Sequence, residues 1–378
     1  MSPRRILLIA GAAESLINFR GPLIAEMIAQ GHEVHVAAPN YEVASGVRSA
    51  LIGMGAKAHA IPLSRTGLNP LADLGALVAL YRLMRRVRPD VALGYTIKPV
   101  VYGTLAAWMA GVPGRFAMIT GLGYAFTGNA HGRRALVQRL ARSLYRLALA
   151  RTSGVMFQNP DDKALFAELG MLAPNVPVTI VNGSGVDLSH YAPQPLPKGP
   201  VQFLMIARLL GDKGLREYAA AAKEIRQTHP EVGIHLVGDH DSNPDAIPID
   251  QIRAWQAEGW LTWHGALDDV RPAIAAAHVY VLPSYREGTP RTVLEAMAMG
   301  RPVITTNAPG CRETIVDGES GFLVPVCELK ALCTAMRRFV DAPALINRMG
   351  AAAQERAKER YDVQVVNRQI LDAIDLSR

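Results

Sequence analysis

Residues 5–38 read RILLIAGAAESLINFRGPLIAEMIAQGHEVHVAA, and this stretch decides the fold. Its first six residues are a short apolar run, which is typical of a buried strand. Apolar residues at helical spacing follow over residues 21–30 and stop at Gly31, and residues 33–38 are strand-like again. A strand, a helix and a second strand in this order predict a parallel β–α–β unit, because parallel strands need a crossover connection.

The same alternation continues along the chain and is interrupted once. Residues 74–87 have a helix pattern that precedes a strand-like run at 90–95. Residues 188–200 contain four prolines, which remove backbone donors and disfavour helix, so this segment is predicted to be a linker. A strand over 201–206 and a helix over 215–227 then begin a second series.

The sequence therefore predicts an α/β protein with two Rossmann-like domains, each a doubly wound parallel sheet, that face each other across a cleft. We expect an N-terminal domain over 1–190, a C-terminal domain over 200–360, and a final helix over 361–378 that crosses back to the first domain. The helical stretch from about 328 to 376 should break at residues 341–343, which contain a proline. Ligands of such sheets bind beyond the carboxyl ends of the strands, so functional motifs are expected in the loops that follow strands.

The positive charge of the chain is concentrated in its first half. Residues 1–190 have 19 Lys and Arg against 10 Asp and Glu, a net charge of +9. Residues 191–378 have 21 against 23, a net charge of −2. This asymmetry indicates that the first half meets an anionic partner, such as a membrane, a nucleic acid or a phosphorylated substrate.

The composition favours a cytoplasmic protein without a membrane span. The apolar run at 6–10 is short for a signal peptide, and the longest uncharged run, 99–114, is interrupted by Pro and Gly and too short to cross a bilayer. Cys311, Cys327 and Cys333 have neither CxxC spacing nor His partners, which favours reduced thiols over a disulfide framework or a zinc site.

The most informative motif is YREGTPRTVLE at residues 285–295, which follows the apolar run HVYVLPS. Thr289 is a suitable helix N-cap and Pro290 a suitable first helical residue. The free N–H groups of such a helix start suit a diphosphate. Glu287 and Glu295 would then reach the sugar and ribose ends of a ligand, although acids near helix starts are also common because they suit the helix dipole.

Two further loops follow predicted strands. Arg208 and Lys213, in IARLLGDKG, are two cations that follow the first strand of the second domain, which suits a diphosphate. Either cation considered alone is also consistent with a solvated surface charge. Gly11 opens the loop GAAES. This loop has one glycine where an NAD-binding fingerprint has three, which favours a plain strand-to-helix turn.

The segment 131–151 has the pattern of a basic amphipathic helix. Leu136, Leu140, Leu144 and Leu147 share one helical face, and a second face carries arginines at 139, 142 and 146. Such a helix lies on anionic lipid or buries its Leu face against the sheet, and the charge asymmetry favours the lipid. For Arg82, Arg85, Arg86 and Arg88 the same two alternatives stay open, contact with anionic lipid or a solvated protein surface.

On the paired motifs Glu287-x7-Glu295 and Arg208 with Lys213, the chain resembles the family 4 glycosyltransferases, which have the GT-B fold. The likeness covers nearly all of the chain. It implies a retaining transfer from a nucleotide diphosphate sugar, with UDP favoured, and it implies no metal and no cofactor.

The resemblance also implies roles for single residues. Arg208 and Lys213 hold the diphosphate, and Glu287 contacts the donor sugar; these three form the catalytic group. Glu295 takes the ribose hydroxyls and Gly11 approaches the phosphates. The other residues expected to bind the donor are Gly288, Thr289 and Leu267, the last in a loop at 265–267 that holds the base.

Four segments are similar to bacterial enzymes that extend lipid-linked oligosaccharides: GAAESLINFR, GYTIKPVVYG, ITGLGYAFT and LVGDHDSNP. One group of these enzymes adds N-acetylgalactosamine α-1,3 to a polyprenyl-diphosphate sugar. The acceptor is then expected on the basic first domain, in contact with Asn18, Arg20, Lys98 and Thr120. Thr120 stands where many relatives carry a His, which puts a His-assisted role in doubt.

The resulting expectation is an enzyme that moves an N-acetylhexosamine from a UDP-sugar to a polyprenyl-diphosphate-linked saccharide during assembly of a bacterial glycan, O-antigen, capsule or exopolysaccharide. It would act at the inner face of the plasma membrane, held on anionic lipid by its basic domain, with no nucleic-acid partner. The alternatives are a nucleotide-sugar epimerase or an inverting transferase with the same fold, an NAD-dependent oxidoreductase, and a non-catalytic carbohydrate- or nucleic-acid-binding protein.

Overall fold

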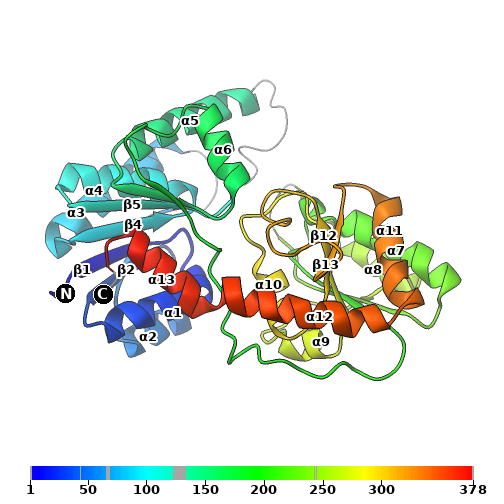
Figure 1. Ribbon diagram of the computed structural model, residues 1–378. Helices are drawn as coiled ribbons and strands as arrows, with labels where there is room; N and C mark the ends of the chain where they lie inside the picture. Colours follow the sequence, from blue (N-terminus) through cyan, green and yellow to red (C-terminus); the bar gives the residue numbers. More distant parts are fainter. Residues whose placement is uncertain are drawn as a thin grey trace. The chain divides into compact units, whose positions relative to one another are not determined.

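The computed structural model describes residues 2–42, 44–64, 69–121, 133–241, 243 and 245–376. The chain forms two compact units (Figure 1). The first unit contains Met1–Ser184 together with Val366–Arg378, and the second contains Gly185–Val365. The division therefore precedes the proline-rich segment 188–200, which lies in the second unit.

The first unit has a parallel sheet with the strand order β3-β2-β1-β4-β5-β6-β7. The strands are β1 (Arg5–Ile9), β2 (Glu33–Ala38), β3 (Lys57–Ala60), β4 (Val91–Tyr95), β5 (Gly114–Ile119), β6 (Gly154–Phe157) and β7 (Val178–Ile180). The helices are α1 (Glu14–Ala29), α2 (Ser45–Gly53), α3 (Pro70–Val87), η1 (Pro99–Gly103), α4 (Thr104–Ala110), α5 (Arg133–Leu149), α6 (Pro160–Glu168) and, from the end of the chain, α13 (Val363–Ala373).

The second unit repeats this strand order. Its parallel sheet runs β10-β9-β8-β11-β12-β13. The strands are β8 (Gln202–Ile206), β9 (Gly233–Val237), β10 (Thr262–Trp263), β11 (Val279–Leu282), β12 (Val303–Thr306) and β13 (Gly321–Val324). The helices are η3 (Gly211–Lys213), α7 (Leu215–Thr228), α8 (Ile249–Ala257), α9 (Arg271–Ala275), α10 (Arg291–Ala298), α11 (Leu329–Asp341), α12 (Ala344–Arg356) and η4 (Ala357–Tyr361).

Helices cover both faces of the first sheet (Figure 1). Successive residues of a strand point to opposite faces, so Ile6 and Leu8 pack with α1, α2 and α13, whereas Leu7 and Ile9 pack with α3 and α4. Ile370 of α13 is fully buried in the first of these two cores. The end of the chain is thus part of the hydrophobic core of the first unit.

The predicted α/β class and the doubly wound parallel sheets are confirmed. Most predicted elements are present, but the first helix begins at Glu14, seven residues before the predicted start at 21. The periodicity of its first turns was hidden by polar residues. Helix α11 ends at Asp341 and α12 begins at Ala344, so the helical stretch is interrupted at Pro343 as predicted.

The predicted basic helix at 131–151 is present as α5, and its predicted leucine face is divided, since Leu144 packs against the core of the first unit. Leu140 and Leu147 are about half exposed, at 48% and 49%, and the buried residues include Tyr145 and Leu149. Tyr145, Ala148 and Leu149 thus form the part of the helix that is buried in the core. Two parts of that prediction lie outside the described residues: positions 131–132 and the side chain of Leu136. Residues 122–127 of ITGLGYAFT also lie outside them.

Candidate functional site

In both sheets the strand order reverses between two adjacent strands, and this point is where open α/β sheets bind ligands. In the second unit the reversal lies between β8 and β11. The loop after β8 carries Arg208 and Lys213, and the loop after β11 carries Glu287. Three predicted donor-site residues thus follow the two strands at the reversal point.

Lys213 and Glu287 are in direct contact. The Lys213 Nζ lies 2.5 Å from the Glu287 Oε1, and each side chain is only 15% exposed. The Ser284 hydroxyl donates to the same carboxylate oxygen at 2.8 Å. This pair presents a cation and a carboxylate side by side, which suits a ligand with a diphosphate next to a sugar.

Two glycines permit this close approach of the loops. Gly214 has φ +74°, and a Cβ at this position would collide with the backbone carbonyl of Pro283 at the end of β11. Gly310 has φ +80°, and a Cβ there would collide with the Glu287 carbonyl. Both positions have the left-handed backbone that favours glycine, so the loop of Lys213 and the loop of Glu287 depend on them.

Arg208 is held by a partner that was not predicted. Its Nη1 donates to the Asp241 Oδ2 at 2.6 Å, and its side chain is 49% exposed. Asp241 lies in the loop after β9. Burial raises the pKa of Asp212, which is influenced by Lys213, Glu287 and Arg208. Of the three predicted catalytic side chains, Lys213 and Glu287 are in contact, whereas Arg208 is paired with Asp241.

Glu295 lies in α10 and is 5% exposed. Arg291 forms an ion pair with it at 2.8 Å, and the Tyr191 hydroxyl also hydrogen-bonds to it. Burial raises the pKa of Glu295, while the Arg291 cation and the Tyr191 hydroxyl oppose that effect.

The predicted start of this helix is wrong by one residue. Pro290 is the N-cap of α10 and has no side-chain cap bond, whereas Thr289 precedes the cap. Pro290 has an extended backbone with ψ 108°, so the helical conformation begins only at Arg291. Gly288 and Thr289 therefore lie in the loop between Glu287 and the helix. Leu267 follows β10 and is 39% exposed, and its contact with the base stays a prediction.

In the first unit the strand order reverses between β1 and β4. Gly11 follows β1, and a Cβ at this position would lie 2.9 Å from the Thr96 Oγ1, so only glycine lets the two loops meet. Thr96 follows β4 and has φ 70°. This conformation is unfavourable for a β-branched residue, and such strain is concentrated at ligand-binding positions.

Lys98 follows the same strand but does not project freely. Its Nζ lies 2.7 Å from the Asp73 Oδ1 and donates to the Ser64 Oγ at 2.9 Å. The Tyr102 hydroxyl donates to the other Asp73 oxygen at 3.0 Å. Burial and the Asp73 charge raise the pKa of Tyr102 to about 12, so it remains a donor. Lys98 is therefore part of a buried polar cluster, and only 12% of its side chain is exposed.

The other predicted acceptor residues occupy different environments. Asn18 is exposed on α1, and Thr120 is half-buried directly after β5. Arg20 is buried within α1, at 2% exposure. Asn18 and Arg20 are two residues apart on a helix, so they point in different directions and do not form one contact surface.

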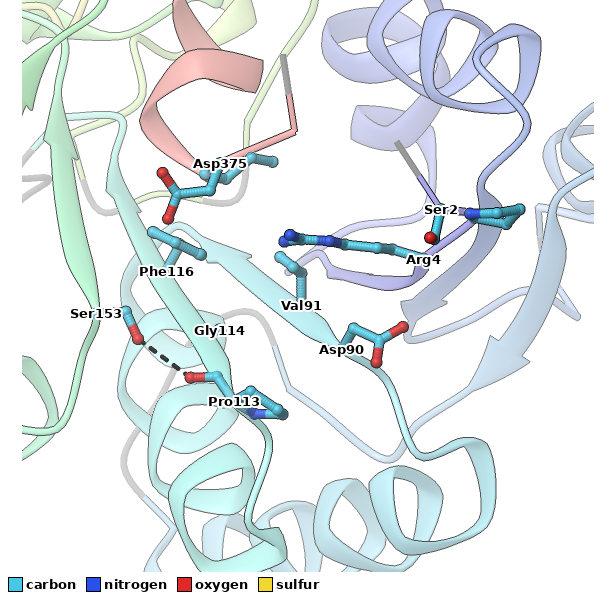
Figure 2. A pocket seen from close by; sticks show the side chains of 11 residues that line it. Ser2, Arg4, Asp90, Val91, Pro113, Gly114, Phe116, Ser153 and Asp375 are labelled. Carbon is cyan, nitrogen blue, oxygen red and sulfur yellow. Dashed lines mark hydrogen bonds between the residues drawn. The ribbon is translucent and has the colours of Figure 1, made fainter. Parts of the chain in front are cut away.

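A cavity of about 530 Å³ lies at the opposite edge of the first sheet. Figure 2 shows Arg4, Asp90, Gly114 and Ser153 around it, at the amino ends of β1, β4, β5 and β6. None of the predicted site residues lines this cavity. Because ligands of these sheets bind at the carboxyl ends, we do not assign it to the catalytic site.

No group of three or more His, Cys, Asp or Glu side chains in the described part of the chain is arranged to hold a metal ion. Metal independence stays a prediction. Cys311, Cys327 and Cys333 are all free thiols, and the first and third are buried. Within the described ranges no helix is long and apolar enough to cross a membrane.

Sequence reasoning missed four residues of these clusters. Asp73, Tyr102, Tyr191 and Asp241 contact predicted site residues but were not assigned a role. Asp241 lies in the quoted segment LVGDHDSNP, so its position after β9 was a usable signal. Asp73 lies on a helix far along the chain from Lys98, and no spacing rule links the two.

Two family models match the chain. Residues 20–183 match the glycosyl transferase 4-like domain, and residues 200–342 match glycosyl transferases group 1. Together they cover the loops of Lys98, Lys213 and Glu287.

Curated relatives match over most of the chain. The N,N'-diacetylbacillosaminyl-diphospho-undecaprenol alpha-1,3-N-acetylgalactosaminyltransferase of Campylobacter jejuni is 26% identical over 98% of this chain and 98% of its own. The UDP-Gal:alpha-D-GlcNAc-diphosphoundecaprenol alpha-1,3-galactosyltransferase of Escherichia coli is 26% identical over 76% of each chain.

Two solved structures illustrate the similarity in fold. The sucrose-phosphate synthase of Thermosynechococcus elongatus has a TM-score of 0.80 at 18% identity and covers 98% of each chain. Anabaena Alr3699/HepE in complex with UDP has a TM-score of 0.76 at 19% identity, over 98% of this chain and 99% of that one.

Proposed function

Since this chain is a GT-B glycosyltransferase, with a glycosyl transferase 4-like domain followed by a group 1 domain, we propose that it transfers an N-acetylhexosamine from its UDP-sugar to a polyprenyl-diphosphate-linked saccharide. The product linkage is α, with α-1,3 favoured by the Campylobacter jejuni relative, which covers the whole chain. The reaction belongs to the assembly of a bacterial surface glycan.

The observation that carries this proposal is the Lys213–Glu287 pair at the reversal point of the second sheet. A departing UDP develops negative charge, and Lys213 and Arg208 supply preorganised positive charge for it. The carboxylate of Glu287 lies next to this cation, where the sugar attached to the diphosphate would lie. We assign the ribose hydroxyls to Glu295, whose carboxylate is held by Arg291 and Tyr191 in the free protein.

Retention follows from attack on the face from which UDP departs. In this scheme the acceptor hydroxyl oxygen forms the new bond to C1, the bond from C1 to the phosphate oxygen breaks, and the hydroxyl proton passes to that departing phosphate oxygen. Glu287 positions the donor sugar and is not a covalent nucleophile. Positioning accounts for a large share of enzymatic rate enhancement, so loss of Glu287 is still costly to the rate.

The acceptor is assigned to the first unit. Thr96, Lys98 and Thr120 all follow strands of the first sheet at their carboxyl ends. The buried Lys98–Asp73 pair holds the loop after β4 in one conformation. We assign to this edge the recognition of the acceptor saccharide and its diphosphate.

The membrane contact is assigned to the three-helix face, formed by the outward residues of α3, α4 and α5. Seven large apolar side chains on it are between 38% and 82% exposed: Leu71, Leu74, Val78, Trp108, Met109, Leu140 and Leu147. These helices cover the same side of the first sheet (Figure 1). Exposed apolar side chains in such a group mark an interaction surface.

The charge of the same three helices points to an anionic partner. Their sequences contain eight arginines and one carboxylate, Asp73, which is buried against Lys98. Exposed apolar side chains and arginines on the same three helices, whose one carboxylate is buried, suit the headgroup region of an anionic bilayer. The enzyme would thus be peripheral at the cytoplasmic face of the plasma membrane, where polyprenyl-diphosphate acceptors are embedded.

Vesicle co-sedimentation tests the membrane contact. Replacing Leu71 and Leu74 by Ser should lower binding to phosphatidylglycerol vesicles about tenfold, since two exposed apolar contacts are lost. Ile52→Ser is the matched control, because Ile52 is 54% exposed on α2, which covers the other face of the sheet. The assignment is contradicted if both variants lose vesicle binding equally, or if the wild type binds neutral vesicles as tightly as phosphatidylglycerol vesicles.

Mass spectrometry of the product tests the reaction. The purified protein is incubated with UDP-N-acetylgalactosamine, UDP-N-acetylglucosamine, UDP-galactose or UDP-glucose and a short-chain prenyl-diphosphate-linked N-acetylhexosamine. We expect mass addition of one N-acetylhexosamine from one of the first two donors. Transfer to a free sugar but not to the lipid-linked acceptor would reject the proposed acceptor while leaving the transferase reaction intact.

A further inference from the structure

Arg20 is one of two arginines that rank among the largest fully buried side chains in the described chain; the other is Arg301. Arg20 lies in α1 and is 2% exposed, and Arg301 lies in the second unit and is 1% exposed. A buried guanidinium is costly unless its five N–H groups are bonded or its charge is paired. The two arginines meet this requirement in different ways.

Arg301 is fully occupied by protein acceptors. It donates to five backbone carbonyls, of residues 194, 195, 274, 275 and 299, at 2.8–3.1 Å. These bonds tie the linker segment to the sheet of the second unit. Arg301 is therefore a structural residue in the ordinary sense.

Arg20 has no comparable set of acceptors. Its Nη2 donates to the Met118 thioether sulfur at 2.8 Å, and its guanidinium lies 5.3 Å from the centre of the Tyr95 ring. The Arg20 Nε is buried without a hydrogen-bond partner. Among the residues that the structure describes, no carboxylate pairs with it. A thioether is a weak acceptor, so most of the hydrogen-bonding capacity of this cation is unused.

The position of Arg20 is informative as well. Tyr95 is the last residue of β4, and Met118 is the next-to-last residue of β5. The guanidinium therefore lies at the carboxyl edge of the first sheet, beside the loops that begin at Thr96 and Thr120. The Tyr95 hydroxyl is hydrogen-bonded to the Ser15 hydroxyl at 2.9 Å, which fixes the ring on which Arg20 lies.

We propose that Arg20 binds a diphosphate group of the substrate, and that this diphosphate is the one that links the acceptor saccharide to its lipid. The inference rests on the proposed function, because it takes a lipid-linked acceptor as the ligand. A diphosphate has the acceptor oxygens and the negative charge that Arg20 lacks, and the planar guanidinium can donate to two of them at once.

The acceptor is the better source of this diphosphate than the donor. The residues that suit the diphosphate of a nucleotide, Arg208 and Lys213, lie in the second unit. Arg20 lies in the first unit, in contact with Met118 and Tyr95. Burial lowers the pKa of Arg20 to about 10, so the side chain is still charged at neutral pH. It is thus an uncompensated cation in the free protein.

Thermal unfolding of the free protein tests whether Arg20 is structural. Arg20→Met should unfold at the same temperature as the wild type or a few degrees higher, since an apolar side chain of similar length replaces an unpaired buried charge. Arg301→Met is the reference for a structural arginine and should unfold several degrees lower, because five carbonyls lose their donor. If the unfolding temperature of Arg20→Met falls by as much as that of Arg301→Met, the proposal is overturned.

Thermal-shift titrations identify the ligand. Farnesyl diphosphate and inorganic pyrophosphate should stabilise the wild type, and this shift should be lost in Arg20→Met but kept in Arg48→Met, which removes an exposed arginine of the same unit. UDP should stabilise all three proteins equally. If the UDP shift is lost in Arg20→Met and the farnesyl diphosphate shift is kept, the diphosphate belongs to the donor and the assignment to the acceptor is wrong.

Steady-state kinetics complete the test. In Arg20→Met the KM for the lipid-linked acceptor should rise about 10- to 100-fold, with an unchanged KM for the UDP-sugar, since a charge-assisted contact is removed. Arg20→Lys should recover part of this loss. A wild type that binds UDP but not farnesyl diphosphate rejects the lipid-linked acceptor, whereas farnesyl diphosphate binding that survives Arg20→Met rejects only the role of Arg20.

Discussion

Substitutions of the two residues of the Lys213–Glu287 pair should have different effects on UDP binding. Glu287→Gln removes the carboxylate charge but keeps an oxygen that can accept from the Ser284 hydroxyl. Lys213 then loses its counter-charge at 2.5 Å and becomes fully available to a diphosphate. Lys213→Met removes the cation that lies 2.5 Å from the Glu287 carboxylate, in a site that is largely shielded from water.

The structure sets the size of these effects. Both side chains are 15% exposed, so breaking the pair should cost about 1–3 kcal/mol of unfolding free energy, less than a fully buried pair. By calorimetry, Glu287→Gln should bind UDP as tightly as the wild type or up to about tenfold more tightly, because Lys213 is no longer paired with a carboxylate. Lys213→Met should bind UDP about 10- to 100-fold more weakly.

The transfer rate gives the second half of the test. Glu287→Gln should lower kcat about 100- to 1000-fold in spite of normal UDP binding, because the donor sugar is no longer held in position. The reasoning is refuted if Glu287→Gln loses UDP binding as severely as Lys213→Met. In that case Glu287 organises the diphosphate site and does not act on the sugar.

Three further predictions concern single contacts. Asp241→Asn should free Arg208 and tighten UDP binding about two- to fivefold by calorimetry, since the pair is half-exposed; weaker binding would contradict this. Tyr191→Phe removes a hydroxyl that bonds to Glu295 and should weaken UDP binding about three- to tenfold with an unchanged melting temperature, whereas unchanged binding would exclude a role in the ribose site. His59 is stacked on a second histidine, with 5.1 Å between the ring centres. Burial and neighbouring cations lower the pKa of His59 to about 4, so the pKa in the folded state lies below the unfolded value of about 6.5. Stability is then fully present above that unfolded value and is lost as the pH falls toward 4, by roughly 1–2 kcal/mol at pH 5; His59→Asn should flatten this loss in urea unfolding, and an identical pH profile would refute the argument.

The fold was largely predictable because its pattern is repeated. Short apolar runs alternate with helical spacing in both halves, and the prolines at 188–200 separate two series of the same kind. The orientation of α5 could not be predicted from the sequence. Its leucines at positions 140 and 147 form an apolar face in sequence and are about half exposed, whereas Tyr145 and Leu149 are buried, and periodicity cannot tell which apolar face meets the sheet.

The candidate site was predictable where residues follow strands. Arg208, Lys213 and Glu287 were placed by their position after two strands of one sheet, and the structure brings the last two into contact. The partners from helices and distant loops were not predictable. Asp73 on α3 meets Lys98 only because α3 packs beside the loop after β4, and such contacts between distant parts of a chain have no local sequence signal.

The measurement that tests the central claim most directly is the anomeric configuration of the new linkage, determined by NMR of the product formed from an α-linked UDP-N-acetylhexosamine and a prenyl-diphosphate-linked sugar. Front-face transfer, with Glu287 positioning the donor, predicts an α linkage. A β linkage would mean attack from the opposite face, and the chain would then be an inverting transferase whose Lys213–Glu287 pair has a different role.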